Sequence, residues 1–270
     1  MKKQNGFAKV NGTCLYYEIA GSGDPLVLLH GFTYNTQGWD DQFEIFATQY
    51  QVIRYDIRGF GNSALPTRES YSHVDDLKAL LENLGISRTH VLGLSMGGEI
   101  AIDFAIVYPE LTTSLITVGS ALGGFPWSEE WRESLAEVRR TLGSMYREGR
   151  LQDAIEFWLN HPLFKPAMEK PNMKFRLVQI TADYSGWHFL NEDPVCELEP
   201  SALQRLEEID VPTLIIVGER DLLEFHAIAD TLQQHILNAR KVVLPGVGHI
   251  SNMEAPDEFN KVVLSFLAGI

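Results

Sequence analysis

The chain has 270 residues, of which 45% are hydrophobic, so it can form one large domain with an insertion around a sizeable core. Its formal charge of -14 argues against nucleic-acid and anionic-membrane partners, because both require a basic surface on the protein. No stretch approaches the roughly 18 apolar residues that a membrane-spanning helix needs.

Predicted strands and helices alternate over the first 118 residues. Two segments of alternating polarity flank Asn11-Gly12 and predict a β-hairpin, which we expect at the antiparallel edge of a sheet. Later apolar runs predict buried strands of a parallel sheet, with helical segments between them. The predicted strands are 7–10, 13–19, 26–29, 51–55, 89–92 and 115–118, and the predicted helices are 37–48, 72–84 and 99–108. This order is typical of a doubly wound α/β sheet.

The alternation is then interrupted by a long helical segment. Residues 122–206 have helical periodicity without a convincing buried strand, and they contain four of the five tryptophans. Strand and helix alternate again afterwards, with predicted strands 213–217 and 241–244 and predicted helices 225–236 and 256–267. We therefore predict a core domain formed by residues 1–121 and 207–270, with a helical insertion at 122–206.

Ser95 lies in the sequence Gly93-Leu94-Ser95-Met96-Gly97, between a predicted strand and a predicted helix. Gly-x-Ser-x-Gly also occurs by chance in glycine-rich loops, but this context is typical of a nucleophile elbow. Gly93 and Gly97 would relieve crowding at a sharp turn that exposes the serine hydroxyl. The N–H of Met96 would lie at the positive end of the following helix, where it could stabilise an oxyanion.

Functional groups of open parallel sheets gather beyond the carboxyl ends of the strands. A serine hydroxyl needs a base beside it, and that base needs an anion that fixes its tautomer. Ser95, Asp221 and His249 satisfy these needs in the order Ser, Asp, His that is expected of this fold. Glu219 and Glu224 are alternative candidates for the orienting acid. Both are better interpreted as solvated charges in a loop. The four strand-end segments are His30-Gly31-Phe32, Ser95, Glu219-Arg220-Asp221 and Val247-Gly248-His249.

Taken together, these motifs resemble the α/β-hydrolase superfamily over nearly the whole chain. The pattern is similar to the subgroup of 3-oxoadipate enol-lactonases, small carboxylesterases and cofactor-free haloperoxidases. The resemblance implies a mostly parallel eight-stranded sheet flanked by helices, with a helical cap inserted after the sixth strand. It also implies that Ser95 is the nucleophile, His249 the base and Asp221 the orienting acid, with the backbone N–H groups of Phe32 and Met96 as oxyanion donors. The segments that carry it are His30-Gly31-Phe32, residues 56–63, residues 93–98, residues 218–221 and Gly248-His249.

The elbow residue narrows the predicted chemistry. Relatives that open epoxides or remove halogens carry aspartate at this position, so Ser95 argues against both activities. We expect a serine hydrolase that cleaves a small, largely apolar carboxylic ester or lactone through an acyl-enzyme. Two alternatives use the same triad, a C–C bond hydrolase and a haloperoxidase or perhydrolase. An alternative of another class is a small-ligand receptor or signalling protein without turnover.

Other residues have predicted roles around this chemistry. Trp127 and Trp187 of the insertion are candidate walls of a substrate pocket. His30 is expected to hold the oxyanion loop through hydrogen bonds, and Arg58 is expected to pair with a carboxylate. The histidines lack paired metal-ligand spacing and the glycines lack a dinucleotide fingerprint, so neither a metal nor a cofactor is expected.

The cysteine pattern bears on the cellular compartment. Cys14 and Cys196 are far apart, which fits reduced thiols better than a disulfide framework. Gln4-Asn5-Gly6 is polar where the apolar segment of a signal peptide would begin. We therefore expect a cytoplasmic protein whose partner is a small-molecule substrate, as a monomer or homodimer.

Overall fold

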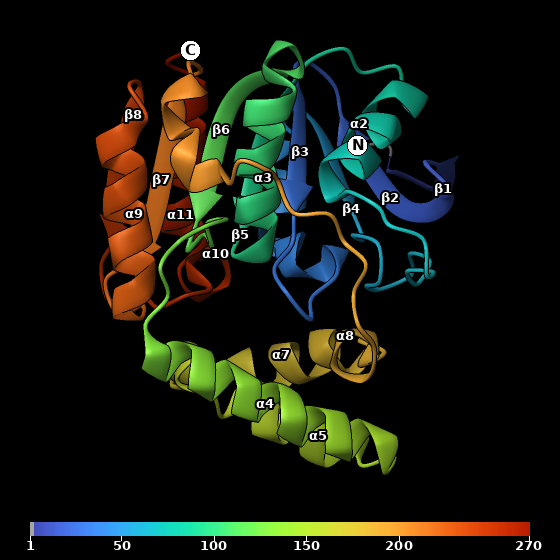
Figure 1. Ribbon diagram of the computed structural model, residues 1–270. Helices are drawn as coiled ribbons and strands as arrows, with labels where there is room; N and C mark the ends of the chain where they lie inside the picture. The colour runs from blue at the N-terminus through green and yellow to red at the C-terminus, as the bar shows by residue number, and fades with distance from the viewer. Residues whose placement is uncertain (1–2) are drawn as a thin grey trace.

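Within residues 3–270, which the computed structural model describes, eight strands form one sheet in the order β1-β2-β4-β3-β5-β6-β7-β8 (Figure 1). Strands β1 and β2 form the predicted hairpin at one edge, β2 pairs antiparallel with β4, and the remaining pairs are parallel. The predicted mostly parallel eight-stranded sheet is therefore confirmed. The strands are β1 (Gln4–Val10), β2 (Thr13–Gly21), β3 (Pro25–Leu29), β4 (Gln51–Tyr55), β5 (Thr89–Leu94), β6 (Thr112–Val118), β7 (Thr213–Gly218) and β8 (Ala239–Leu244).

Helices cover both faces of the sheet. In Figure 1, α3 lies in front of the central strands and α11 lies behind them; α2 packs beside α3, and α1 packs beside α11. Strands β5 and β7 are buried along their whole length, as the continuous apolar runs predicted. The flanking helices are α1 (Asp40–Phe46), α2 (His73–Asn83), α3 (Met96–Val107), α9 (Leu223–His235), α10 (Ser251–Glu254) and α11 (Pro256–Leu267).

Five α-helices lie between β6 and β7, and Figure 1 shows the ones it labels as a separate layer beyond one end of the sheet. We refer to residues 122–206 as the cap, following the proposed domain division. Its longest helix begins after Ser128, whose side chain accepts a hydrogen bond from the N–H of Trp131. The helices of the cap are α4 (Glu129–Arg147), α5 (Leu151–Leu159), α6 (Lys165–Met168), α7 (Met173–Ala182) and α8 (Trp187–Leu190).

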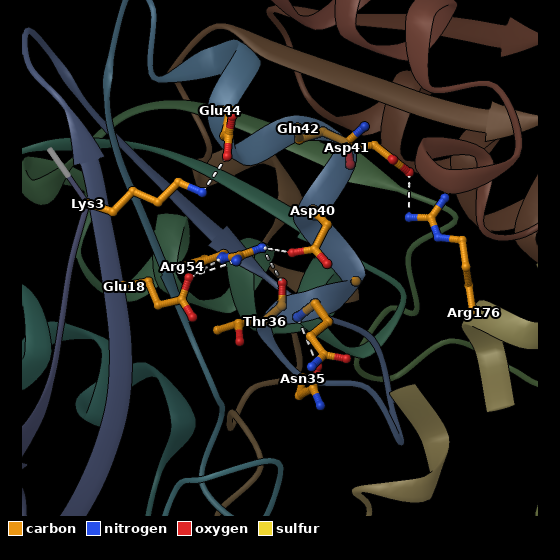
Figure 2. Close-up of polar contacts among 12 residues, drawn as sticks. Lys3, Glu18, Asn35, Thr36, Asp40, Asp41, Gln42, Glu44, Arg54 and Arg176 are labelled. Carbon is orange, nitrogen blue, oxygen red and sulfur yellow. Dashed lines mark hydrogen bonds and ion pairs between the residues drawn. The ribbon is translucent and has the colours of Figure 1, made fainter. Parts of the chain in front are cut away.

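Polar contacts connect the cap to the core domain. Figure 2 shows Arg176 of α7 reaching Asp41 of α1, with a distance of 2.7 Å between Nη2 and Oδ2. On the core side, Arg54 of β4 binds Glu18 and Asp40, which ties the start of α1 to the sheet. Since both charges of the Arg176–Asp41 pair are half-buried, the pair helps to fix the cap over the core.

Arg58 forms a buried ion pair at the edge of the core. Its Nε and Nη2 atoms donate to the two carboxylate oxygens of Asp76 at 2.7 and 2.6 Å, and both side chains are almost fully buried. The neighbouring Gly59 and Gly61 have φ angles of 90° and 51°, which glycine adopts without strain. The predicted pairing of Arg58 with a carboxylate is confirmed, and its partner comes from helix α2.

Two further findings concern the chain as a whole. In the described part of the chain, no helix is both long enough and apolar enough to cross a membrane. Cys14 is half-buried on β2 and Cys196 is exposed, and both are free thiols.

Candidate active site

Ser95 occupies a strained turn between β5 and α3. Its backbone has φ of 54° and ψ of -114°, a conformation that residues with a side chain rarely adopt. Hydrogen bonds hold this turn: the N–H of Ser95 donates to Val118 O at 2.9 Å, and the N–H of Ala121 donates to Ser95 O at 3.2 Å. Strain of this kind persists where the surroundings enforce it, as at many functional sites.

The predicted helix after Ser95 begins earlier than the sequence indicated, at Met96 instead of residue 99. Gly97 and Gly98 lie in the first turn of α3, where the packing leaves no room for a side chain on either residue. A Cβ atom on Gly97 would lie 2.4 Å from Leu29 O, and one on Gly93 would lie 2.0 Å from Gly97 O. Glycine on both sides of the elbow is therefore a packing requirement.

Replacing Gly97 with alanine should destabilise the fold by about 3 kcal/mol or more, because the new methyl group would meet backbone atoms that cannot move aside. Urea unfolding measures this change. Gly269→Ala is the matched control, since its Cβ would have no contact shorter than 3.4 Å. Equal unfolding midpoints for the two variants would contradict the packing argument.

His249 and Asp221 form a buried pair beyond the ends of β8 and β7. The Nδ1 atom of His249 lies 3.0 and 3.2 Å from the two carboxylate oxygens of Asp221. The N–H of Leu222 also donates to Asp221 Oδ1, at 2.8 Å. Because a carboxylate only accepts hydrogen bonds, Nδ1 carries the imidazole proton and Nε2 is left as the acceptor. Asp221 therefore sets the tautomer that a general base needs.

Two neighbours of this pair were missed by sequence reasoning. Gly119, with φ of 47°, lies so close that a Cβ on it would be 3.0 Å from His249 Nδ1 and 3.1 Å from Asp221 Oδ2. The ring of Phe225 packs against the imidazole, with centroids 4.3 Å apart. The only signal for Gly119 was its position at the end of a predicted strand.

Ser95 and His249 line one cavity of about 500 Å³ beneath the cap. Within residues 3–270, the Nε2 atom of His249 has no hydrogen-bond partner, so the serine hydroxyl does not donate a hydrogen bond to it. Hydrogen bonds of this type often form only when substrate is bound. The candidate nucleophile therefore lies in the same cavity wall as a candidate base whose Nε2 atom can still accept a hydrogen bond.

The loop after β3 lies next to the elbow. A Cβ on Gly31 would be 3.5 Å from the Cβ of Ser95. Among residues 3–270, the backbone N–H groups of Phe32 and Met96 donate to no protein acceptor, so both are free for a ligand oxygen. The next residue, Thr33, has φ of 65°, and its hydroxyl accepts a 2.9 Å hydrogen bond from the indole of Trp158. A cap residue thus supports the candidate oxyanion loop.

His30 stabilises the same loop from below. Its Nε2 atom accepts a hydrogen bond from the N–H of Ile57 at 3.0 Å, so its Nδ1 atom donates to Gly31 O at 2.8 Å. Complete burial lowers the pKa of this imidazole and keeps it neutral. His30 thus makes the hydrogen bonds to this loop that were expected of it.

Aromatic and aliphatic side chains together form most of the wall of the Ser95 cavity, which also includes Arg132 and Arg139. Trp127 lies in that wall, as predicted. Trp187 is not among the described lining residues; its ring packs edge-on against His188, with centroids 5.0 Å apart. Its neighbours His188 and Phe189 line the cavity instead. The aromatic lining residues are Phe32, Tyr34, Trp127, Trp131, Trp158, Phe164, Phe189 and Phe225.

Glu99 and Asp103, one helical turn apart on α3, were not predicted as site residues. Glu99 lines the Ser95 cavity. Burial, together with the charges of Asp103 and Glu197, raises the pKa of Glu99 to about 7, and burial raises the pKa of Asp103 to about 7. Both residues lie among apolar helix positions, which is why the sequence pattern gave no sign of their environment.

Glu99→Gln should stabilise the protein at pH 8 by about 3 kcal/mol and leave its stability unchanged at pH 4. Between pH 4.5 and about 7, the folded protein keeps a proton on Glu99 that the unfolded chain has lost. The free energy of unfolding of the unsubstituted protein therefore falls as pH rises through this range, whereas glutamine has no proton to lose. Urea unfolding at the two pH values measures the difference. A gain of equal size at both would contradict the raised pKa.

A mostly parallel sheet that carries a serine in a strained strand-to-helix turn defines the class of α/β hydrolases. The family model described as "alpha/beta hydrolase fold" matches residues 24–256, and this chain belongs to that family. The resemblance that the motifs indicated is thereby confirmed.

Several relatives cover nearly the whole chain. It is 31% identical to a putative 2-succinyl-6-hydroxy-2,4-cyclohexadiene-1-carboxylate synthase of Bacillus subtilis strain 168, over 94% of this chain and 95% of that protein. It is 30% identical to a 2-hydroxy-6-oxononadienedioate/2-hydroxy-6-oxononatrienedioate hydrolase of Paraburkholderia phymatum, over 94% and 90%. The solved enol-lactonase of Burkholderia xenovorans LB400 superposes with a TM-score of 0.79 at 26% identity, covering 97% of this chain and 100% of that one.

Proposed function

We propose that this protein is a serine hydrolase that cleaves a small, largely apolar carboxylic ester or lactone through an acyl-enzyme. The observation that carries the proposal is the shared cavity: Ser95 in a strained turn lies in the same wall as His249, whose Nδ1 is held by Asp221. The aromatic walls favour an apolar acyl group.

The proposed reaction has two halves. His249 Nε2 takes the proton of Ser95 as Oγ attacks the ester carbonyl, and the N–H groups of Phe32 and Met96 receive the oxyanion. The alcohol leaves with that proton. Water then attacks the acyl-enzyme and loses a proton to His249. The bond between the acyl carbon and Ser95 Oγ breaks as His249 returns that proton to Oγ, which releases the acid and the free serine hydroxyl. A lactone would open by the same steps to a hydroxy acid.

A C–C bond hydrolase is the second candidate, and the relative in Paraburkholderia phymatum favours it, because that protein is named as a dienedioate hydrolase. The two reactions differ in the bond that breaks when the tetrahedral intermediate collapses. A peroxide-dependent reaction would use the same acyl-enzyme with another acceptor.

The two free cysteines support a cytoplasmic location for any of these reactions.

The test is turnover of p-nitrophenyl esters of increasing acyl length, with simple lactones, a vinylogous diketone and a peroxide-dependent assay alongside, and with Ser95→Ala as the blank. We expect fast ester or lactone hydrolysis with a preference for one acyl length. Turnover at the level of the blank on every ester and lactone would overturn the proposal, and activity on the diketone alone would select the C–C hydrolase.

A further inference from the structure

A second cavity, of about 710 Å³, adjoins the Ser95 cavity on the side of α3. The two cavities share six residues in their walls: Phe32, Met96, Glu99, Trp127, His188 and Asp193. We call the second one the acid cavity, because six carboxylic acids and no lysine or arginine line it in the described part of the chain. Its acids are Asp75, Glu99, Asp103, Asp193, Glu197 and Glu199. A ligand bound at Ser95 would therefore lie next to the acid cavity.

Polar atoms in the wall of the acid cavity lack hydrogen-bond partners. Within residues 3–270, Asp103 Oδ1 and His73 Nδ1 are buried without any hydrogen bond. Buried polar atoms are almost always paired, so each of these atoms calls for an explanation such as a ligand. Glu99 also has no hydrogen-bonded side-chain partner among the described residues, and it lies on the wall between the two cavities.

No lysine or arginine lines the acid cavity, although Arg132 and Arg139 line the adjoining Ser95 cavity. Burial lowers the pKa of His73 to about 3, so this imidazole is neutral. Arg205, the cation that acts on Asp103, is already paired with Glu208 at 2.7 Å. Burial raises the pKa of both Glu99 and Asp103 to about 7. A bound cation would restore the ionised carboxylates and offset the cost of their burial.

The lining favours an organic cation over a metal ion. No group of three or more His, Cys, Asp or Glu side chains is arranged to hold a metal in the described part of the chain. Aromatic rings are present instead: Phe125 and Trp127 lie edge to face with centroids 5.3 Å apart, and both line the acid cavity. Carboxylates combined with aromatic faces are the surroundings that recognise substituted ammonium groups.

We propose that the acid cavity binds the ammonium group of a cationic ester substrate, with Glu99 as the residue that selects for positive charge. This inference rests on the proposed function of the Ser95 cavity. Glu99 lies in the first turn of α3, directly after Ser95, and both residues line the Ser95 cavity, so one small ester could reach both. The acyl group would then occupy the aromatic Ser95 cavity.

Acetylcholine and 3,3-dimethylbutyl acetate test the proposal, because the two esters have the same shape and differ only in the charge at the quaternary centre. We expect kcat/KM for the cationic ester to exceed that for the neutral ester by about tenfold or more at pH 8. Glu99→Gln should reduce this ratio to near one, because it removes the proposed charge that distinguishes the two esters. Glu110→Gln, an exposed acid outside both cavities, should keep the ratio of the unsubstituted protein.

A ratio near or below one in the unsubstituted protein, or a ratio that Glu99→Gln leaves unchanged, would overturn the proposal while the hydrolase function stands. If neither ester is hydrolysed, calorimetric binding of choline and of 3,3-dimethylbutan-1-ol tests the cavity without turnover. Choline binding that Glu99→Gln weakens about tenfold would support it. Absence of choline binding would overturn it.

Discussion

Ser95→Ala should lower kcat for ester hydrolysis on the order of 10⁴-fold or more, with the fold intact. Alanine removes only the hydroxyl oxygen, and the strained backbone at φ of 54° is held by hydrogen bonds from the main chain. The free energy of unfolding should therefore change by less than about 1 kcal/mol. Steady-state kinetics on the preferred ester and urea unfolding of the same preparation measure both quantities.

His249→Ala is the informative companion to Ser95→Ala. Its Nε2 atom is the only proposed acceptor for the serine proton, so we expect a loss of similar size. The double variant should be no slower than either single variant, because the groups act as a unit. Ester hydrolysis at the original rate in Ser95→Ala would eliminate the acyl-enzyme mechanism. Losses that multiply in the double variant would mean that the two side chains act independently.

Arg58→Ala should destabilise the protein by about 3–5 kcal/mol, because it leaves the buried carboxylate of Asp76 without its cation and with only the hydrogen bond from Asn11. Burial already raises the pKa of Asp76, and the hydrogen bonds from Arg58 are the main influence that lowers it again. The guanidinium also lies 4.3 Å from the ring centroid of Tyr71. Urea or thermal unfolding at neutral pH measures the effect.

Arg150→Ala is the matched control for this prediction. Arg150 pairs with Glu148 and Asp153, but all three side chains are about half exposed, so water can replace the contacts. We expect almost no change in its unfolding midpoint. A double variant, Arg58→Met with Asp76→Leu, should recover much of the stability that Arg58→Ala loses, since it removes both buried charges. Similar losses in Arg58→Ala and Arg150→Ala would mean that burial does not strengthen the pair.

Local patterns in the sequence determined the secondary structure and the chain order in which Ser95, Asp221 and His249 occur. The hairpin at Asn11-Gly12, the strand before Ser95 and the helix after it each follow from short-range periodicity or turn chemistry, which act within a few residues. The sequence also predicted that the residues at the strand ends gather, because parallel strands bring their carboxyl ends to one edge of the sheet. Asp221 and His249 could thus be paired before any distance was known.

Only the tertiary structure decided which side chains of the cap and of α3 face the cavities. Trp127 and Trp187 were equivalent in the sequence, yet one lines the Ser95 cavity and the other packs on His188. In the sequence, Glu99 is an ordinary helical position. In the structure it is buried, and this burial together with the charges of Asp103 and Glu197 raises its pKa. Burial and cavity shape depend on segments distant along the chain that pack together, and such packing leaves no periodic signal in any one of them.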